Sequence, residues 1–418
     1  MDMEVPCNKS MVLANDASDD EEEEEIGEVV AEEAVGLPTD LIYYEVLSRI
    51  PVEILLPLCR RVSKDWQSLA GEWRFRQANY QRTQVLCGFF VQSFCYCHAK
   101  YDRAIEFVSK LDHSPPIPCP TLEKLCKKPR RFSILGSCSN NSAGILCCYA
   151  PYRARYFIYK PTTNDMMFLP NPITQFKTVA VELMVLKYIK QCHIHYKVFR
   201  VSRLEIGSGN SEHHCEIFDS KRPWKWKRTG NRSLPRKFFP CEQGVLINAA
   251  FHWVSKFTTI SYGIIAYDMK DERWRSDIKV PRQINDSFDC YHFCKLVDYN
   301  GKLGLIHHAI NDRDLCMSLK IWVMEDYHHV EKKWSVVRSY LEGVHSPLWA
   351  SPVMQIHGDW LLAMRLDGRM VWIDYDRRDV SCARHKIICR EARRVVRAFP
   401  FESDSSPVDL QYSAFKRS

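Results

Sequence analysis

The stretch "LPTDLIYYEVLSRIPVEILLPLCRRVSKDWQSLA", residues 37–70, contains 18 apolar residues among 34. Read at helical period, Leu41, Val46 and Ile50 fall largely on one stripe, which predicts a first short helix. Pro51 should end this helix, because the residue before a proline is displaced from the α region. The stretch therefore begins with a helix that has one apolar face.

Two further helical pieces follow. "VEILLPLC" is interrupted by Pro57, and "RVSKDWQSLA" places Val62, Trp66 and Leu69 at the i, i+4 and i+7 positions of one face. Three short helices in about 35 residues bury too little surface to be stable alone, since domains below about 40 residues usually need a partner. Either another protein or the rest of the chain covers the surplus apolar surface, and spacing leaves both readings open.

From about Gly88 onward, short β-branched and aromatic runs are separated by turn residues. Many short strands with few long helical patterns predict an all-β domain. The runs are "GILCCYA", "RYFIYKP", "YKVFRVSR", "HCEIFDS", "VLINAAFHWVS", "GIIAYDM", "GKLGLIHHAI", "LKIWVME" and "RMVWIDYD".

An internal repeat of strand, polar turn and aromatic strand runs through this domain. The equivalent positions, at steps of 59, 49, 56 and 51 residues, are Tyr159, Phe218, Tyr267, Val323 and Asp374. A period near 50 is typical of a kelch-type propeller blade with four strands. Trp226, Trp274 and Trp334 recur after the turns, and we expect them to pack between blades. The same alternation predicts a solvated hairpin at "DYDRRD".

Charge divides the chain unequally. Residues 1–36 hold 13 acidic side chains and one lysine, a net charge of −12, and the remainder carries +19, which gives the overall +7. The run "DDEEEEE" at 19–25 cannot bury apolar surface and should be disordered. It is either a solubilising tail or a segment that engages a basic surface. We find no secretory signal and no apolar run of 18 residues, so we expect no membrane span.

The sequence offers little chemistry. The 18 cysteines are scattered in "CYCH", "CHIH", "HHC" and "CYHFC" without a matched zinc spacing, which favours free structural thiols in the cytosol or nucleus over a metal site. Phosphate-loop, dinucleotide, hydrolase and zincin motifs are absent from the sequence. We therefore expect no catalytic residues, no cofactor and no enzymatic activity.

Three basic runs keep a nucleic-acid-binding alternative open. Cations alternate with aromatic or valine residues in "KKPRRF" at 127–132, "KRPWKWKR" at 221–228 and "REARRVVR" at 390–397. Such patches can bind phosphate and stack bases. They are not contiguous and match no known module, so a solvated surface or one facing an acidic partner is the favoured reading.

The opening stretch resembles an F-box. Leu37-Pro38 with Asp40-Leu41, "EVLSRIPV", Leu55-Leu56 and "RVSKDWQSL" follow that family's order, with one extra residue near Tyr43 and another in 57–61. The resemblance implies that this segment binds the Skp adaptor of a cullin–RING ubiquitin ligase. By position, the residues that would form or support that interface are Leu37, Pro38, Leu41, Ile42, Ile50, Pro51, Leu55, Leu56, Val62 and Trp66.

The β region resembles the F-box-associated domain of plant F-box proteins over roughly residues 88–400. The matching segments are "SILGSCSNNSAGILCC", "YKPTTNDMMFLPNP", "VLINAAFHWVS" with "IIAYDMKDERWR", and "LKIWVMEDY" with "KKWSVV". Lys160 stands where the family often has asparagine. The resemblance implies a propeller-like β domain that holds a target protein.

The sequence thus predicts an acidic tail (1–36), a small all-α F-box of three short helices (37–80), a large all-β, kelch-like propeller (81–405) and a C-terminal tail (406–418). The expected function is that of the substrate adaptor of an SCF-type ubiquitin ligase in the cytoplasm or nucleus. Its expected partners are a Skp-family adaptor, through it a cullin, and a protein substrate. The alternatives are a non-ligase propeller interaction protein whose helical segment docks on its own β domain, or a nucleic-acid binder.

Overall fold

A computed structural model of the 418-residue chain gives the fold. It describes residues 38–50, 55, 58–59, 61–69, 72–82, 87–95, 102–109, 132–138, 144–161, 165–189, 193–206, 210–221, 223–232, 243–256, 262–285, 290–311, 316–327, 333–343, 355–357, 360–364, 369–374, 379–386, 395–402 and 410. Contacts divide the chain into two units, residues 1–39 and 40–418. The predicted acidic tail at 1–36 lies outside the described residues.

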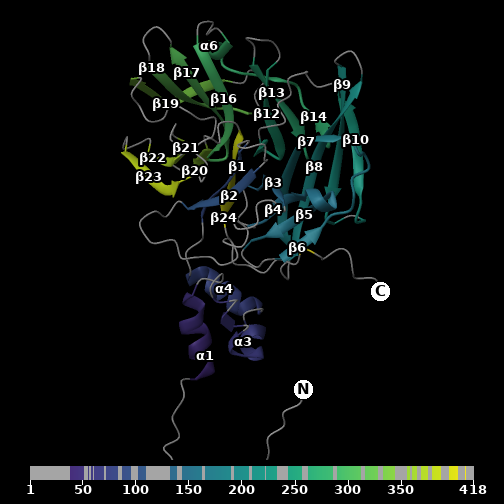
Figure 1. The fold of residues 1–418 in the computed structure, drawn as a ribbon, viewed down its shortest axis with the longest axis vertical. Helices are drawn as coiled ribbons and strands as arrows, with labels where there is room; N and C mark the ends of the chain where they lie inside the picture. Colours follow the sequence, from purple (N-terminus) through teal and green to yellow (C-terminus); the bar gives the residue numbers. More distant parts are fainter. Residues whose placement is uncertain are drawn as a thin grey trace, which may run out of the picture. The chain divides into compact units, whose positions relative to one another are not determined.

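Short helical pieces occupy the described residues between 38 and 82, here called the helical segment, and these include the start of the second unit (Figure 1). The first helix changes type along its length, as α1 (Thr39–Leu41), the π-helical turn η1 (Ile42–Val46) and the 3₁₀ turn η2 (Leu47–Arg49). Ile50 then turns extended, with φ −88° and ψ 128°. The expectation that Pro51 ends the first helix is confirmed. α3 (Lys64–Leu69) lies within the predicted third helical piece.

A further helix, α4 (Trp73–Arg82), was not predicted, and it secures the end of the first helix. The buried amide of Asn79 donates to the carbonyls of Ser48, at 3.0 Å, and Ile50, at 2.6 Å. Arg82 pairs with Glu45 at 3.0 Å. Carbonyls at a helix C-terminus lack intrahelical partners, so Asn79 satisfies groups that would otherwise need water.

The β domain consists of antiparallel sheets built mostly from consecutive strands. After the opening hairpin, the first sheet contains β3 (Ser133–Ser137), β4 (Leu146–Ala150), β5 (Arg155–Lys160) and β6 (Asp165–Phe168). The second sheet contains β7 (Lys177–Ile189), β8 (His193–Ile206), β9 (Asn210–Asp219) and β10 (Trp226–Arg232). The third sheet contains β11 (Val245–Ile247), β12 (Ala250–Lys256), β13 (Tyr262–Asp268), β14 (Arg273–Trp274) and β15 (Ile278–Lys279). The 3₁₀ turn η5 (Pro151–Arg153) joins β4 to β5, and a short helix, α6 (Arg282–Asn285), follows β15.

Two more four-stranded sheets complete a five-bladed propeller arrangement among the described residues. Their strands are β16 (Cys290–Tyr299), β17 (Lys302–Asn311), β18 (Cys316–Met324) and β19 (Trp334–Gly343); and β20 (Gln355–His357), β21 (Trp360–Met364), β22 (Arg369–Asp374) and β23 (Asp379–Lys386). A three-stranded sheet pairs the hairpin of β1 (Cys87–Cys95) and β2 (Asp102–Ser109) with the last strand, β24 (Val395–Glu402), and so joins the two ends of the domain (Figure 1).

The repeat read from the sequence is confirmed strand by strand. Each of the five equivalent positions lies on the third strand of a four- or five-stranded sheet: β5, β9, β13, β18 and β22. Phe218 pairs with Trp226 and Tyr267 with Trp274 across the third and fourth strands. The hairpin predicted at "DYDRRD" is present as β22 and β23, with Asp374 opposite Asp379.

The hydrophobic cores lie between successive sheets, and the recurring tryptophans belong to them. Trp226 is buried in the core that the β3–β6 and β7–β10 sheets share, Trp274 packs on the next core and Trp334 on the one after. Trp226 donates to the Pro170 carbonyl at 2.8 Å, and Trp334 to the Lys279 carbonyl at 3.0 Å. The expectation that these tryptophans pack between blades is confirmed.

Candidate functional site

The helical segment has a small core of its own. Its buried members are Leu47, Leu55, Cys59, Leu69 and Phe75. Leu55, which the F-box resemblance places at or behind the adaptor interface, is only 1% exposed. Its side chain therefore supports the fold of the segment and does not lie on its surface.

Four large apolar side chains of the same segment are left uncovered, and we call them the exposed apolar set: Leu41, Val46, Leu58 and Val62, which are 45–57% exposed. Ile42, Ile50 and Trp66 are partly buried against the core, and Pro38 is exposed. Leu37, Pro51 and Leu56 lie outside the described residues. Val46 and Leu58 were not among the predicted interface residues, which follow by position from the F-box resemblance.

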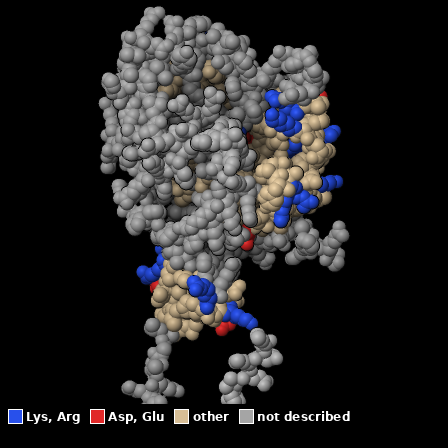
Figure 2. Space-filling model, in the orientation of Figure 1, with Lys and Arg blue, Asp and Glu red and all other residues tan. Residues whose placement is uncertain are grey.

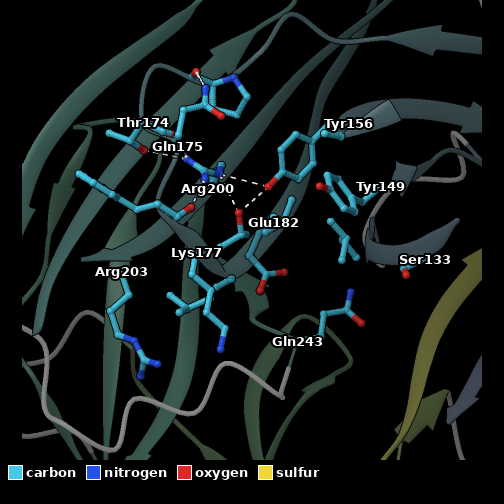
Figure 3. A pocket seen from close by; sticks show the side chains of 18 of the residues that line it. Ser133, Tyr149, Tyr156, Thr174, Gln175, Lys177, Glu182, Arg200, Arg203 and Gln243 are labelled. Carbon is cyan, nitrogen blue, oxygen red and sulfur yellow. Dashed lines mark hydrogen bonds between the residues drawn. The ribbon is translucent and has the colours of Figure 1, made fainter. Parts of the chain in front are cut away.

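A second candidate site is a cavity of about 790 Å³ in the β domain, here called the β7 cavity (Figure 3). Its described lining comes from β3, β4, β5, β7, β8, β24, the 172–176 segment, Ala154 and Gln243. β3, β7 and β24 are edge strands of their sheets, and β3 contacts both of the others. β7 carries a bulge between Thr178 and Ala180 beside this cavity. Bulges re-aim side chains and are common next to functional sites.

Arg200 on β8 ties the segment before β7 to its sheet. Its side chain is 3% exposed and pairs with the fully buried carboxylate of Glu216 on β9. The guanidinium also donates to the Thr174 hydroxyl at 2.9 Å and to the Phe176 carbonyl at 2.8 Å (Figure 3 shows the Thr174 contact). Glu216 accepts the Thr174 backbone N–H at 2.8 Å. These hydrogen bonds satisfy the buried charges, so the network fixes one wall of the cavity.

Glu182 on β7 contributes a carboxyl group to the same cavity. This residue is 2% exposed, and its Oε1 accepts the Gly244 N–H at 2.6 Å and the Trp253 indole N–H at 3.0 Å. Burial raises the pKa of Glu182 from 4.5 to about 8, although these hydrogen bonds oppose the rise. The carboxyl group is therefore mostly protonated near neutral pH.

Gly244 is needed where it stands, and its replacement by alanine tests the packing around Glu182. An added Cβ would lie 2.7 Å from the Trp253 indole nitrogen and 2.9 Å from Glu182 Oε1. Since overpacking a rigid core costs about 1–3 kcal/mol, Gly244→Ala is expected to lower the free energy of unfolding by that amount in urea denaturation. The same change in a Trp253→Phe background should cost less, and an equal cost in both backgrounds would contradict this packing.

A row of basic residues crosses the sheet beside Glu182. Lys177 on β7 is directly opposite Arg203 on β8, and Arg203 is opposite His213 on β9. Burial, with a further contribution from Arg203, lowers the pKa of His213 to about 4, so this imidazole is neutral near pH 7. Figure 3 shows Lys177, Arg203, Glu182 and Gln243 around one side of the cavity.

Sequence reasoning did not find the β7 cavity. The available signal was a set of charged residues inside otherwise apolar strands, such as Glu182 in "TVAVELMVL", Arg200 in "KVFRVS" and Glu216 in "HCEIFD". Burying a charged side chain costs free energy unless it is paired, so a charge inside an apolar strand indicates that a partner faces it. Which charges meet depends on strand register, and the sequence does not give the register.

The β domain exposes many basic side chains, but the tryptophans of its basic run 221–228 do not form a surface on which nucleic-acid bases would stack. In "KRPWKWKR", Trp224 and Trp226 pack into a core, and Lys227 is exposed and pairs with Glu272 at 2.6 Å. Figure 2 shows Lys and Arg side chains spread over the described surface of this domain. Runs 127–131 and 390–394 lie outside the described residues.

The cysteines that the structure describes as free and buried serve as small core residues. They are Cys59, Cys138, Cys147, Cys148, Cys215 and Cys294. Burial raises the pKa of the Cys215 thiol to about 12, which keeps it protonated and unreactive. Among the described residues, no group of three or more His, Cys, Asp or Glu side chains has metal-binding geometry, and no helix is long and apolar enough to span a membrane.

Comparison with known proteins defines the class. The family model described as "F-box associated beta propeller domain" matches residues 94–354, more than half of the chain. The chain belongs to this family.

Similar proteins are also known from Arabidopsis thaliana. A putative F-box protein is 26% identical over 203 residues, which cover 46% of this chain and 55% of that protein. A second F-box protein is 26% identical over 246 residues (57% and 56%), and a third is 28% identical over 169 residues (38% and 84%). The chain thus spans about half the length of the first two relatives.

Proposed function

We propose that this chain is the substrate-recognition adaptor of an SCF-type cullin–RING ubiquitin ligase. In this proposal the helical segment binds a Skp-family adaptor, and through it a cullin, while the β domain binds a protein target. The observation that carries the proposal is the exposed apolar set, which lies on a segment with F-box sequence and belongs to a chain of the F-box-associated propeller family. A short segment that leaves four large apolar side chains exposed offers apolar surface that a partner could cover.

The mechanism is proximity and not side-chain chemistry. An adaptor that holds a target beside a conjugating enzyme turns an encounter between separate molecules into one within a complex, at a high effective concentration. Proteins of this family act as interaction adaptors, and no residue of this chain is assigned a catalytic role. The proposed organisation is a tail at 1–36, an F-box domain at 37–80, a kelch-like β domain at 81–405 and a tail at 406–418, in a protein of the cytoplasm or nucleus.

A double variant tests the proposal at the surface that carries it. Leu58→Asp with Val62→Asp is expected to weaken binding to a recombinant Skp-family adaptor at least 100-fold, because a charge at the centre of an apolar interface costs several kcal/mol. Calorimetric titration of the full chain measures the affinity. Val336→Asp, on the exposed face of β19, is the matched control and should bind as the wild type does. Leu55→Asp is unsuitable, since it would place a charge in the helical core.

The same variants address the two alternatives. Unchanged adaptor affinity in the double variant would contradict the proposal. A large fall in the unfolding midpoint of the double variant would favour a helical segment docked on its own chain. A nucleic-acid binder would show affinity for DNA that falls steeply with salt, with a logarithmic slope near −0.9 per phosphate contact, whereas the adaptor should show no such binding.

A further inference from the structure

Glu182 brings to the lining of the β7 cavity one carboxyl oxygen that the fold does not use. The Gly244 N–H and the Trp253 indole N–H both bond to Oε1, whereas Oε2 has no hydrogen bond or ion pair with the described residues. The side chain is 2% exposed, and a buried carboxyl group without an ion pair favours its neutral form. Because Oε1 already accepts two hydrogen bonds, the proton belongs on Oε2, which is then a hydrogen-bond donor.

The neighbouring Gln243 provides an acceptor. It directly precedes Gly244, whose N–H holds Glu182, so the two side chains start from the same part of the cavity wall (Figure 3). The amide nitrogen of Gln243 donates to the carbonyl and the hydroxyl of Ser137, at 3.3 and 3.2 Å. Its amide oxygen is buried and has no hydrogen-bond partner among the described atoms. A buried acceptor without a partner is costly, so a ligand that donates to it gains affinity.

The cations of the lining do not determine what this part of the cavity binds. Arg200 is ion-paired within its own sheet, and Arg203 and Arg397 have interaction partners as well. Lys177 is exposed, so water solvates its ammonium group. The buried polar groups that a ligand would satisfy are therefore the neutral donor and the neutral acceptor that lie next to each other.

We propose that the β7 cavity binds a primary carboxamide group, whose oxygen accepts from Glu182 Oε2 and whose N–H donates to Gln243 Oε1. A primary carboxamide carries its oxygen and one N–H on the same edge, so it meets a donor and an acceptor that are neighbours. The N–H of a trans peptide bond points away from its carbonyl oxygen, so an ordinary backbone amide makes only one of the two contacts. A carboxylate has no donor for Gln243.

The carboxamide belongs either to an asparagine or glutamine side chain of a target protein or to a free small molecule, and its contacts are the same in both cases. The cavity volume of about 790 Å³ lies within the range of sites for small ligands. Leu135, Tyr149 and Phe399 add apolar surface to the lining, which suits the hydrocarbon part of either ligand. As the place where an adaptor recognises its target, this inference rests on the proposed function; as a carboxamide site, it does not.

Titration of the full chain with benzamide, followed by ligand-detected NMR near pH 6.5, tests the site. N-methylbenzamide and benzoate are the matched probes, because they keep the ring and change only the polar group. Benzamide is expected to bind about tenfold more tightly than either, since each of the other probes leaves one hydrogen bond unmade. Equal affinity for the three probes, tighter binding of benzoate, or no binding of benzamide up to about 20 mM would overturn the proposal.

Three variants assign the binding to the two residues. Gln243→Met removes the acceptor at similar side-chain length and should weaken benzamide binding about tenfold. Gln283→Met makes the same exchange at an exposed position outside the cavity lining and should bind as the wild type does. Glu182→Gln replaces the O–H donor by an N–H donor and should retain binding near neutral pH. Unchanged affinity in a Gln243→Met variant with wild-type circular dichroism would contradict the assignment.

The pH dependence of binding gives a readout that a purely structural role of Glu182 would not change. Its pKa is about 8, so wild-type affinity for benzamide should fall as the pH rises above 8 and the donor loses its proton, whereas Glu182→Gln should bind equally at pH 6.5 and 9. The charged groups in the same lining are Lys177, Arg200, Arg203 and Arg397. Burial raises the pKa of the nearby Cys147 thiol and of the Tyr156 hydroxyl, so both stay neutral. Identical pH profiles for wild type and variant would overturn the role of Glu182 as donor.

Two fluorescent peptides, in which glutamine or glutamate alternates with serine, then identify the source of the carboxamide. Binding of the glutamine peptide that Gln243→Met loses would assign the site to a target side chain, and benzamide binding without peptide binding would assign it to a small molecule. Gln243→Met should bind the Skp-family adaptor with unchanged affinity. A wild-type chain that binds the adaptor but not benzamide would overturn this inference alone, whereas one that binds benzamide but not the adaptor would overturn the proposed function alone.

Discussion

Replacement of Arg200 by methionine is expected to lower the free energy of unfolding by about 3–5 kcal/mol. Glu216, which is fully buried, would lose its ionic partner. Removing one member of a buried pair leaves the other charge without compensation, and this penalty exceeds the loss of ordinary packing. Arg200 donates a hydrogen bond to the Thr174 hydroxyl, so the segment around Thr174 would also be released from the wall of the β7 cavity. Urea denaturation of the full chain measures the change.

The control is a variant in which both charges are removed. Arg200→Met with Glu216→Leu replaces the pair by apolar side chains and should recover most of the lost stability, because such replacements are often neutral. The interaction energy from the double-mutant cycle should then be large and favourable to the pair. A cost below about 1 kcal/mol for Arg200→Met alone would mean that the pair is solvated and does not fix the wall.

The second large effect concerns pH and Glu182. The pKa of its carboxyl group is about 8 in the folded protein and 4.5 in the unfolded chain, so the folded state holds a proton that the unfolded state has released between these values. Stability contributed by this group is therefore fully present below about pH 4.5 and is lost as the pH rises through 8. Between pH 6 and pH 8 the expected loss is roughly 2 kcal/mol.

Glu182→Gln should abolish that loss, because glutamine stays neutral and its oxygen can still accept from Gly244 and Trp253. Comparing urea denaturation of wild type and variant at pH 6, 7 and 8 isolates the contribution. Glu325→Gln is the matched control: this exposed carboxylate pairs with Lys302 and has a lowered pKa, so it is ionised in both states throughout the range and should leave the wild-type slope unchanged. Parallel pH profiles for wild type and Glu182→Gln would show that the carboxyl group is ionised in the fold.

Much of the β domain follows from local pattern, and this explains why it was predictable. An aromatic or acidic residue near the end of one strand and an aromatic residue after the turn recur because the third and fourth strands of each sheet form a hairpin, as Phe218 and Trp226 do. Features within a hairpin lie close in sequence. The period near 50 residues and the packing role of the tryptophans could therefore be read directly.

The β7 cavity could not be predicted for the opposite reason. Lys177 and Arg203 are 26 positions apart, and they meet because of the register of two long strands that contain bulges. Glu182 becomes buried because Gly244 and Trp253, from another sheet, cover it. Sequence pattern shows that a charge sits in an apolar strand but does not show what it faces.

The helical segment was predictable in part, less than the strand repeat of the β domain and more than the β7 cavity. Its first helix and its end at Pro51 follow from period and from the proline, whereas the burial of Leu55 and the exposure of Val46 depend on how the helices pack. α4 was missed because "WRFRQANYQR" has little apolar periodicity. Its contribution is polar, through Asn79 and Arg82, and hydrophobic patterning cannot show that.

Assembly of the full chain with a purified Skp-family adaptor and cullin tests the central claim most directly. Light scattering after size-exclusion chromatography gives the mass of each species. An adaptor of this class should enter one complex of equal stoichiometry with both partners, and the chain should not bind the cullin when the Skp-family adaptor is left out. Separate elution of a chain that retains its β-sheet circular dichroism signal would contradict the account, since a folded F-box segment should not leave its partner unbound.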